Sequence, residues 1–369
     1  MRKLGVIALS TPHHGGTYQY TQSMLQGLRY CQGYDITLYA DPGNDGYVAS
    51  GFPIRAFAAT KLRQIAEVTA DAFKIRLSEP FPGEDILLAP IYTPALLRTA
   101  KPFAFTLHDL QELYYPGNFS WGQRLWRRRT NKRLAEKATQ ILCESSHVRM
   151  DVISAFAIRQ EKITVIAAPP LRRTGALVDA AGLELVCDRY QLPNRFLLYP
   201  AQFWPHKNHL KLIEAFRQIS DIYPELGLVL TGQERNDFPV VMAAIEKAGL
   251  SGRVRHIGHV GQDDLGSIYR LAAMLVMPSL FESISIPIYE AFQAGTPVAA
   301  AGILAIPEQA GDAAVLFDPH LPASIAGAIR RILDDSSFAR SLVLKGRERI
   351  AAMTPETYGQ KLQAMLDRL

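Results

Sequence analysis

The chain has 369 residues, of which 48% are hydrophobic and 20% are charged. This composition excludes a disordered protein, and the length exceeds what one hydrophobic core usually supports, so we expect two soluble globular domains. The formal net charge of +5 favours an anionic partner without specifying which one.

The N-terminal stretch, MRKLGVIALSTP, places two basic residues before an apolar run. That run is shorter than the apolar region of a secretory signal and no small-residue cleavage site follows it, so a first β-strand is the better prediction. No segment approaches the roughly 20 apolar residues of a transmembrane helix. The three cysteines, Cys31, Cys143 and Cys187, lack metal-ligand spacing and are typical of reduced thiols. We therefore expect a cytoplasmic protein.

Short apolar stretches alternate with longer amphipathic ones, which predicts parallel sheets flanked by helices. In the first block the predicted strands are 4–9, 34–40, 85–90, 103–109, 139–145 and 163–168, with helices over 17–29 and 60–77 among others. In the second block they are 195–201, 226–232, 253–259, 274–279, 296–301 and 313–319, with helices over 209–220 and 239–248. Pro169, Pro170 and the polar stretch to about Leu192 indicate a connection between domains spanning about 1–175 and 185–352. A single large sheet is the alternative, which the length and the proline break disfavour.

Ligands of open α/β sheets bind beyond the carboxyl ends of the strands, so polar residues and glycines at those ends are candidate site residues. Gly15 and Gly16 follow the first strand and precede a helix, where they would let a phosphate approach the backbone, although a lone Gly-Gly is more often a turn. His108 and Asp109 end the predicted strand 103–109. A histidine in such a place is as often structural as functional.

His206 and Lys207 follow the first strand of the second block, just before a helix. A lysine there can neutralise a diphosphate, or it can simply be exposed. Glu308 lies in a short helical turn before the last strand.

The most informative stretch, FESISIPIYEAFQAGTPVAA, begins at Phe281. Glu282 follows a buried strand, and we place Glu290 in the first turn of the next helix, for which Pro287 is a natural first residue. The free N–H groups of this loop and the helix end can hold an anion while the two carboxylates accept hydrogen bonds from hydroxyl groups. A sugar joined to a diphosphate meets both needs. The alternative is that neither glutamate binds a ligand: Glu290 would only interact favourably with the helix dipole, and Glu282 would be a solvated loop residue.

Six of the ten residues from Arg124 to Arg133 are basic, with Trp121 and Trp126 beside and within the run. A solvated helix face is the default interpretation, and a surface that meets anionic lipid is the main alternative. No nucleic-acid-binding motif accompanies the run, so we expect no nucleic acid partner.

Several of these stretches together resemble the retaining nucleotide-sugar glycosyltransferases of family 4, whose hallmark is a Glu-x7-Glu pattern. The matching segments, in chain order, are HHGGTYQYTQSMLQGL, HDLQELYYPGNFS, WPHKNH, HIGHVGQDDLGSIYRLAAMLVMPS, the Glu282–Glu290 stretch with GTPV, and IPEQAGDAAVLFDP. The resemblance implies the GT-B fold, with two facing Rossmann-like α/β domains, parallel sheets and an inter-domain cleft. It also implies that a C-terminal helix over about 353–369 crosses back onto the first domain.

The resemblance assigns roles to matching residues. Glu282 would bind hydroxyls of the donor sugar and Glu290 those of the ribose. Lys207 would bind the diphosphate and stabilise its charge as the nucleotide leaves. In the first domain, His108 would line the reaction centre beside Asp109. Gly16, next to Gly15, would let the backbone come close to the phosphates or the transferred sugar.

The chain departs from the family at two places. His206 stands where the family usually has an arginine beside the phosphate lysine, and Arg235 is a candidate to compensate. The family's glycine-rich loop is replaced by Ser283, Ile284 and Ser285, whose backbone amides would have to contact the donor with side chains attached.

The resemblance is strongest to mannosyl- or rhamnosyl-type transferases of bacterial surface polysaccharide synthesis. It implies GDP-mannose as donor, a glycan or polyprenyl-linked acceptor, and peripheral contact with the inner face of the plasma membrane through the Arg124–Arg133 run. No carboxylate cluster suited to magnesium is visible, so we expect a metal-independent enzyme without a cofactor. The alternatives are a non-enzymatic two-domain sugar- or nucleotide-binding protein and a nucleotide-sugar epimerase of similar architecture.

Overall fold

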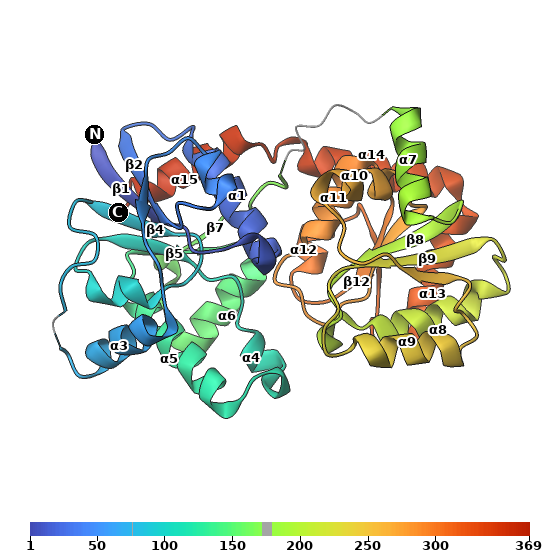
Figure 1. Ribbon diagram of the computed structural model, residues 1–369, viewed down its shortest axis with the longest axis horizontal. Coiled ribbons are helices and arrows are strands. Elements are labelled where there is room, and N and C mark those ends of the chain that lie inside the picture. The colour runs from blue at the N-terminus through green and yellow to red at the C-terminus, as the bar shows by residue number, and fades with distance from the viewer. Residues whose placement is uncertain (76, 172–178) are drawn as a thin grey trace. The chain divides into compact units, whose positions relative to one another are not determined.

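The computed structural model describes every residue except 76 and 172–178. The chain divides into two compact units, which we describe separately. Unit 1 contains Met1–Leu171 and Met353–Leu369, and unit 2 contains Arg172–Ala352. Each is built on one parallel β-sheet with helices packed against it (Figure 1). The prediction of two parallel-sheet α/β domains is therefore confirmed.

The sheet of unit 1 has seven strands in the order β3-β2-β1-β4-β5-β6-β7, and all neighbouring strands are parallel. The strand order reverses direction between β1 and β4, which defines the switch point of this sheet. The strands are β1 (Arg2–Ile7), β2 (Tyr34–Ala40), β3 (Ile54–Ala56), β4 (Ile86–Ala89), β5 (Phe103–Thr106), β6 (Gln140–Cys143) and β7 (Ile163–Val165).

Side chains alternate across this sheet, so each strand contributes to two cores. Leu4 and Val6 of β1 pack with helices on one face, whereas Ile7 packs on the other. The first face carries α1 (Gly16–Leu28) and α15 (Pro355–Leu366), which pack against each other. The second carries α3 (Lys61–Ala72), η2 (Pro94–Arg98), α5 (Trp121–Lys137) and α6 (Ser146–Phe156). Short helical turns complete the unit: η1 (Pro12–His14), α2 (Asp45–Val48), α4 (Gln111–Tyr114), η3 (Pro116–Asn118) and η4 (Gln160–Lys162).

The sheet of unit 2 has six parallel strands in the order β10-β9-β8-β11-β12-β13, with its switch point between β8 and β11. The strands are β8 (Arg195–Pro200), β9 (Leu226–Thr231), β10 (Val254–His256), β11 (Met274–Met277), β12 (Val298–Ala301) and β13 (Val315–Phe317). The helices are α7 (Ala180–Tyr190), η5 (Pro205–Lys207), α8 (His209–Ser220), α9 (Phe238–Lys247), α10 (Gln262–Leu271), α11 (Ile286–Ala294), α12 (Ile306–Ala310), α13 (Pro322–Asp334) and α14 (Ser336–Ala351).

Two predicted segments need correction. The helix predicted over 60–77 ends at Ala72, because Lys74 adopts a positive φ of 55° that an α-helix cannot continue through. The stretch predicted as a connection up to Leu192 contains α7, whose first turn is capped by the Asp179 side chain. The part of that connection over 172–178 lies outside the described residues.

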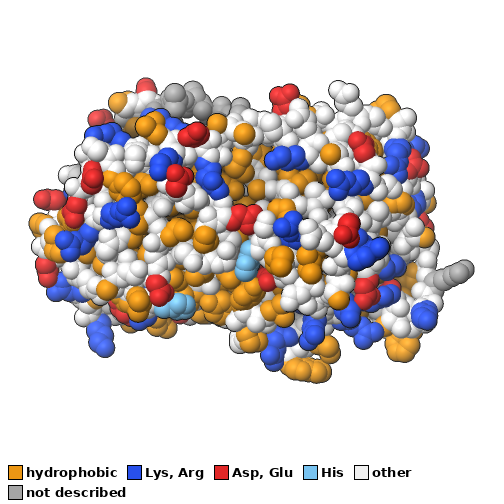
Figure 2. Space-filling model, turned by 180° about the vertical axis from the view of Figure 1, so that it is seen from behind, with side chains coloured by type: hydrophobic (Ala, Val, Ile, Leu, Met, Phe, Trp, Pro, Cys, Tyr) orange, Lys and Arg blue, Asp and Glu red, His pale blue; other side chains and the backbone are white. Residues whose placement is uncertain are grey.

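The surface mixes charges of both signs. Over the face seen in Figure 2, Lys and Arg side chains are interspersed with Asp and Glu, and hydrophobic side chains lie between them. Among the described residues, no helix combines the length and the apolar character needed to cross a membrane.

Candidate functional site

In unit 2 the switch point brings a lysine and a glutamate together. Lys207 ends the turn η5 after β8, and Glu282 lies in the loop after β11, so both stand at the carboxyl edge of adjacent strands. Lys207 Nζ donates to Glu282 Oε1 at 2.7 Å. The pair is largely but not fully buried. An ammonium has three N–H donors, so this contact leaves Lys207 able to bind an anionic ligand as well.

Hydrogen bonds between backbone and side chains fix the turn that carries Lys207. The Tyr199 hydroxyl, from β8, donates to the Lys207 carbonyl at 2.6 Å. Asn208 takes the left-handed conformation with φ 62°, which asparagine tolerates better than most residues, and its amide donates to the carbonyls of Pro278 and Pro319 at 2.9 Å each. The turn is therefore tied to the loop after β11, which fixes the backbone of Lys207 near Glu282.

Glu290 lies one turn further along α11 than predicted. The helix begins at Ile286 behind the N-cap Ser285, so Pro287 is its second residue and the first turn contains no acidic side chain. The Glu290 carboxylate is buried and accepts a hydrogen bond from the Tyr269 hydroxyl at 2.8 Å. Its place is thus fixed by a partner from α10 rather than by the helix dipole.

The loop between the two glutamates is held by Gln309 of α12. The N–H of Ser285 donates to Gln309 Oε1 at 2.8 Å, and Gln309 Nε2 donates to the Ser285 carbonyl at 2.6 Å. The Ser285 amide is therefore engaged, contrary to the expectation that it contacts a ligand. Ser283 and Ile284 are partly exposed.

The structure also shows the surroundings of His206, which replaces the family's arginine, and of Arg235, the residue expected to compensate for it. The His206 carbonyl accepts a hydrogen bond from the N–H of Leu280, so the backbone of His206 also helps to tie this turn to the loop after β11. The Arg235 guanidinium lies 5.5 Å above the Trp204 ring and donates to Gln202 Oε1 at 3.2 Å. Arg235 thus lies beside the loop that precedes Lys207, but it is engaged by neutral partners there.

His209, which follows this turn, is part of the core. Its ring stacks on Phe203 with centroids 4.3 Å apart and is fully buried. Burial, with a smaller contribution from the charge of Lys207, lowers the pKa of His209 to about 3. The imidazole is therefore neutral near pH 7 and takes no part in anion binding as a cation.

In unit 1, His108 follows β5 and has a hydrogen-bond acceptor at each ring nitrogen. Nδ1 lies 2.9 Å from Glu144 Oε2, and Nε2 lies 2.9 Å from the Pro90 carbonyl oxygen. The Tyr20 ring packs edge-on against the imidazole at 4.6 Å. Burial alone would lower the pKa of His108, but the Glu144 carboxylate and the Pro90 carbonyl outweigh it and raise that pKa. Both contacts are satisfied only by the doubly protonated imidazolium, so this geometry favours a positive charge.

Asp109 is held by an arginine of the basic run. Arg127 Nη2 lies 2.9 Å from Asp109 Oδ1, and its Nε lies 2.8 Å from Glu112 Oε2. Arg133 likewise pairs with Asp71 of α3 at 2.8 Å. The run is therefore not uniformly solvated: two of its arginines bind carboxylates of unit 1, which removes them from the surface proposed to meet lipid.

Gly15 and Gly16 lie at the start of α1, after β1 and beside the switch point. Gly15 is the N-cap with φ 57° and ψ −117°, a conformation that favours glycine, and a Cβ added there would meet no atom within 4 Å. Gly16 is the first residue of the helix. The backbone at Gly15 is therefore not covered by other side chains.

A pocket of about 900 Å³ opens at the same edge of unit 1, beyond β1, β2 and β4. Its walls combine aromatic rings with hydrogen-bonding groups, among them Asn44, Phe57, Lys61, Gln64 and Tyr92. Aromatic faces with convergent polar groups suit a ligand that has both apolar faces and hydroxyl groups.

Four residues that matter here were missed from the sequence. The sequence predicts Glu144 inside the strand 139–145, but β6 ends at Cys143, so Glu144 is a strand-end residue like the others. Arg127 is one of several arginines in the basic run, and the sequence gives no sign of its two carboxylate partners. Tyr269 and Gln309 gave no local signal, because each acts on a residue more than twenty positions away.

Comparison with known proteins agrees with this architecture. The profile described as Glycosyltransferase Family 4 matches residues 14–168, and that described as Glycosyl transferases group 1 matches residues 190–349. The O-antigen chain mannosyltransferase RfbU of Salmonella typhimurium is 24% identical over 86% of this chain and 87% of its own length. The O-antigen chain mannosyltransferase B of Escherichia coli is 27% identical over 57% of this chain and 56% of its own length. This chain therefore spans little more than half of that relative.

Among solved structures, Anabaena Alr3699/HepE in complex with UDP and glucose superimposes with a TM-score of 0.77 at 18% identity, over 99% of this chain and all of that one. The two parallel-sheet units are thus those of the GT-B fold. With both profiles matched in order, the chain belongs to the family 4 type of GT-B glycosyltransferases.

Proposed function

We propose that the protein is a retaining glycosyltransferase that moves a hexose from a nucleoside-diphosphate sugar to a glycan or lipid-linked acceptor. The observation that carries the proposal is the pairing of Lys207 with Glu282 at the switch point of unit 2, together with the buried Glu290 on the helix that follows. One cation suits the diphosphate, and two carboxylates on separate elements suit two sets of hydroxyl groups. We assign the transferred sugar to Glu282 and the ribose to Glu290.

We propose GDP-mannose as donor and surface polysaccharide synthesis as the context, with mannose or a rhamnose-like hexose transferred. Support comes from the mannosyltransferases of O-antigen chains among the relatives. The acceptor is assigned to unit 1, whose pocket and imidazolium lie at the carboxyl edge of its sheet. A cationic His108 would stabilise negative charge near the reacting groups.

Thermal stability in the presence of GDP, UDP, ADP and dTDP tests the proposal, since a ligand that binds only the folded protein raises its melting temperature. We expect GDP to give the largest rise. A larger rise with another diphosphate would replace the proposed base, and no rise with any of them would argue for a protein that does not use nucleotide sugars.

Metal independence is a separate part of the proposal. Mannosyl transfer should continue in EDTA, because Lys207 supplies the charge that a divalent cation would otherwise bring to the diphosphate. Loss of transfer in EDTA with recovery on adding Mg²⁺ would contradict it.

A further inference from the structure

Helix α3 of unit 1 leaves a row of apolar side chains exposed to solvent, although its Val68 and Ala70 are buried. Leu62 and Ile65 within the helix, and Phe73 just after it, are 82%, 52% and 74% exposed. Ala66 and Ala72 are exposed as well. Positions three, four and seven apart share one face of a helix, so these side chains form a continuous strip. Surface helices usually bury such a strip, so its exposure needs an explanation.

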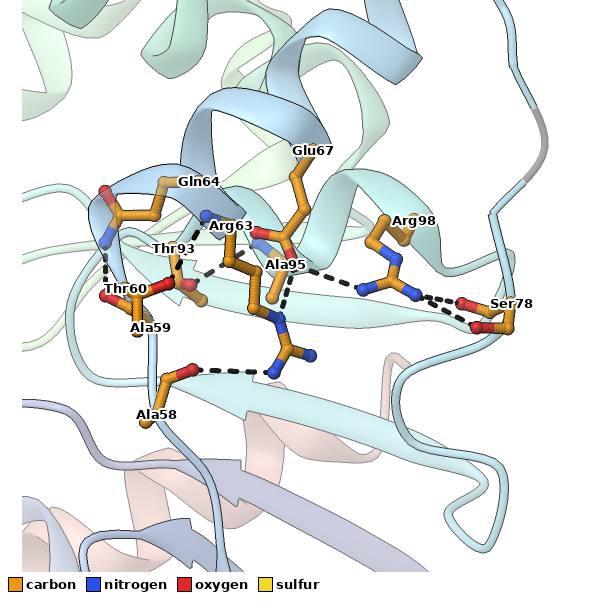
Figure 3. A network of polar contacts seen from close by, with 10 residues as sticks. All are labelled: Ala58, Ala59, Thr60, Arg63, Gln64, Glu67, Ser78, Thr93, Ala95 and Arg98. Atoms are coloured by element: carbon orange, nitrogen blue, oxygen red, sulfur yellow. Dashed lines mark hydrogen bonds and ion pairs between the residues drawn. The ribbon is translucent and has the colours of Figure 1, made fainter.

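The inward side of the same helix carries a buried ion-pair network beside Val68 and Ala70, which explains its orientation. The Glu67 carboxylate is almost fully buried, with Arg63 Nε at 3.1 Å and Arg98 Nη1 at 3.3 Å from the same oxygen (Figure 3). Arg98 also donates to the Ser78 carbonyl at 2.6 Å. Buried charges are tolerated only when they are paired, so this network fixes α3 with the strip outward.

The neighbouring helix α5 adds positive charge on the same side of the sheet. Val68 of α3 and Leu134 of α5 belong to one core beneath both helices. The Arg133–Asp71 ion pair ties the two together. Arg128 and Arg129 of α5 face solvent.

The charged residues of α3 also make its outer surface positive. Lys61 and Lys74 are exposed at its two ends, whereas both of its acidic residues, Glu67 and Asp71, are paired with arginines. The outer surface of these two helices therefore combines exposed apolar side chains with exposed cations. That is the composition of segments that lie in the interface of an anionic membrane.

We propose that the exposed faces of α3 and α5 dock the protein onto an anionic lipid bilayer. A second copy of the chain is a poorer occupant, because a two-fold contact would set the same cations against each other. The docking surface differs from the one expected from the sequence: its apolar part comes from α3, and the basic run contributes the solvent-facing Arg128 and Arg129.

The position of α3 links this surface to the pocket of unit 1. Lys61 and Gln64 line that pocket, and Gln64 and Arg63 donate to the carbonyls of Ala59 and Ala58 in its wall. A bilayer seated on α3 therefore lies beside the pocket. This consequence rests on the proposed function: an acceptor anchored in the bilayer by its lipid would present its glycan there.

Co-sedimentation with vesicles of phosphatidylcholine, with and without phosphatidylglycerol, tests the proposal. The parent should bind the anionic vesicles, and added salt should weaken that binding. A strip variant carries Leu62→Ser, Ile65→Ser and Phe73→Ser, and should bind at least about tenfold more weakly because it loses the inserted apolar area. A matched control, with three similarly exposed leucines of unit 2 replaced, should bind like the parent; it carries Leu185→Ser, Leu321→Ser and Leu344→Ser.

Equal binding of strip variant and parent, or no binding of the parent to either vesicle, would overturn the proposal. So would a parent dimer that the strip variant lacks, because the strip would then be the contact between two copies. Binding of nucleoside diphosphate, measured on the same proteins, separates the two questions. It should be unchanged in all of them, and its absence from the parent would count against the proposed function alone.

Discussion

Replacing Lys207 with alanine should destabilise unit 2 because it leaves the carboxylate of Glu282 buried without its cation. The two groups are 2.7 Å apart, and their side chains are 21% and 9% exposed. Removing one partner of a fully buried pair costs about 3–5 kcal/mol, and the partial exposure here reduces this to about 1–3 kcal/mol. For a unit of this size, that corresponds to a fall in melting temperature of roughly 2–10 °C.

A double-mutant cycle isolates the interaction. Urea denaturation of the parent, Lys207→Ala, Glu282→Ala and the double variant should give a coupling energy of at least about 1 kcal/mol. The control is the pair Lys211–Glu214 on the neighbouring helix, which has a similar distance of 2.9 Å but side chains 39% and 51% exposed. Its coupling should be about 0.5 kcal/mol or less. Equal coupling energies for the two pairs would refute the claim that burial makes the Lys207 contact strong.

Three further predictions concern the surroundings of the two sites. Gln309→Ala should lower the free energy of unfolding by about 2–4 kcal/mol, because both backbone groups of Ser285 lose their buried partner, and a change below about 0.5 kcal/mol would contradict this. His209 has a pKa of about 3 in the folded protein against 6.5 unfolded, so unfolding takes up a proton between these values and stability should fall by up to about 1.4 kcal/mol per unit as pH drops from 6.5. The His209→Phe variant should lose that part of the slope in urea titrations at several pH values; an identical slope would show that other groups cause it. Arg127→Ala should cost about 1–3 kcal/mol through its two carboxylate partners, whereas Arg129→Ala on the exposed side should stay within about 0.5 kcal/mol, and equal effects would contradict the different roles assigned to them.

The elements of the fold were largely predictable from local patterns. The helix predicted over 209–220 has the bounds of α8, and the strand predicted over 34–40 has those of β2. Both have an uninterrupted pattern, apolar residues at helical spacing in α8 and a buried run bounded by turns in β2. The placement of Lys207 and Glu282 at strand ends followed from the same reasoning, because parallel strands end at one edge of the sheet.

What the sequence could not show is how distant side chains meet. Tyr269 fixes Glu290, Gln309 fixes Ser285, and Glu144 charges the imidazole of His108. Each contact joins different elements of the fold, and no periodicity along the chain records it.

The orientation of α3 was hidden for a related reason. Its apolar spacing predicts a helix correctly, but the same pattern normally predicts that the apolar side is buried. Only the partners of Glu67, one of which comes from η2, show that this carboxylate faces inward while Leu62 and Ile65 stay exposed.

Binding of GDP to the carboxyl edge of unit 2 is the central claim, and calorimetric titration tests it most directly. The account predicts binding to the parent and to the control Lys211→Ala. It predicts at least about tenfold weaker binding to Lys207→Ala, which lacks the cation for the diphosphate, and to Glu290→Ala, which lacks the acceptor for the ribose. Equal GDP affinity in all four proteins would contradict the account.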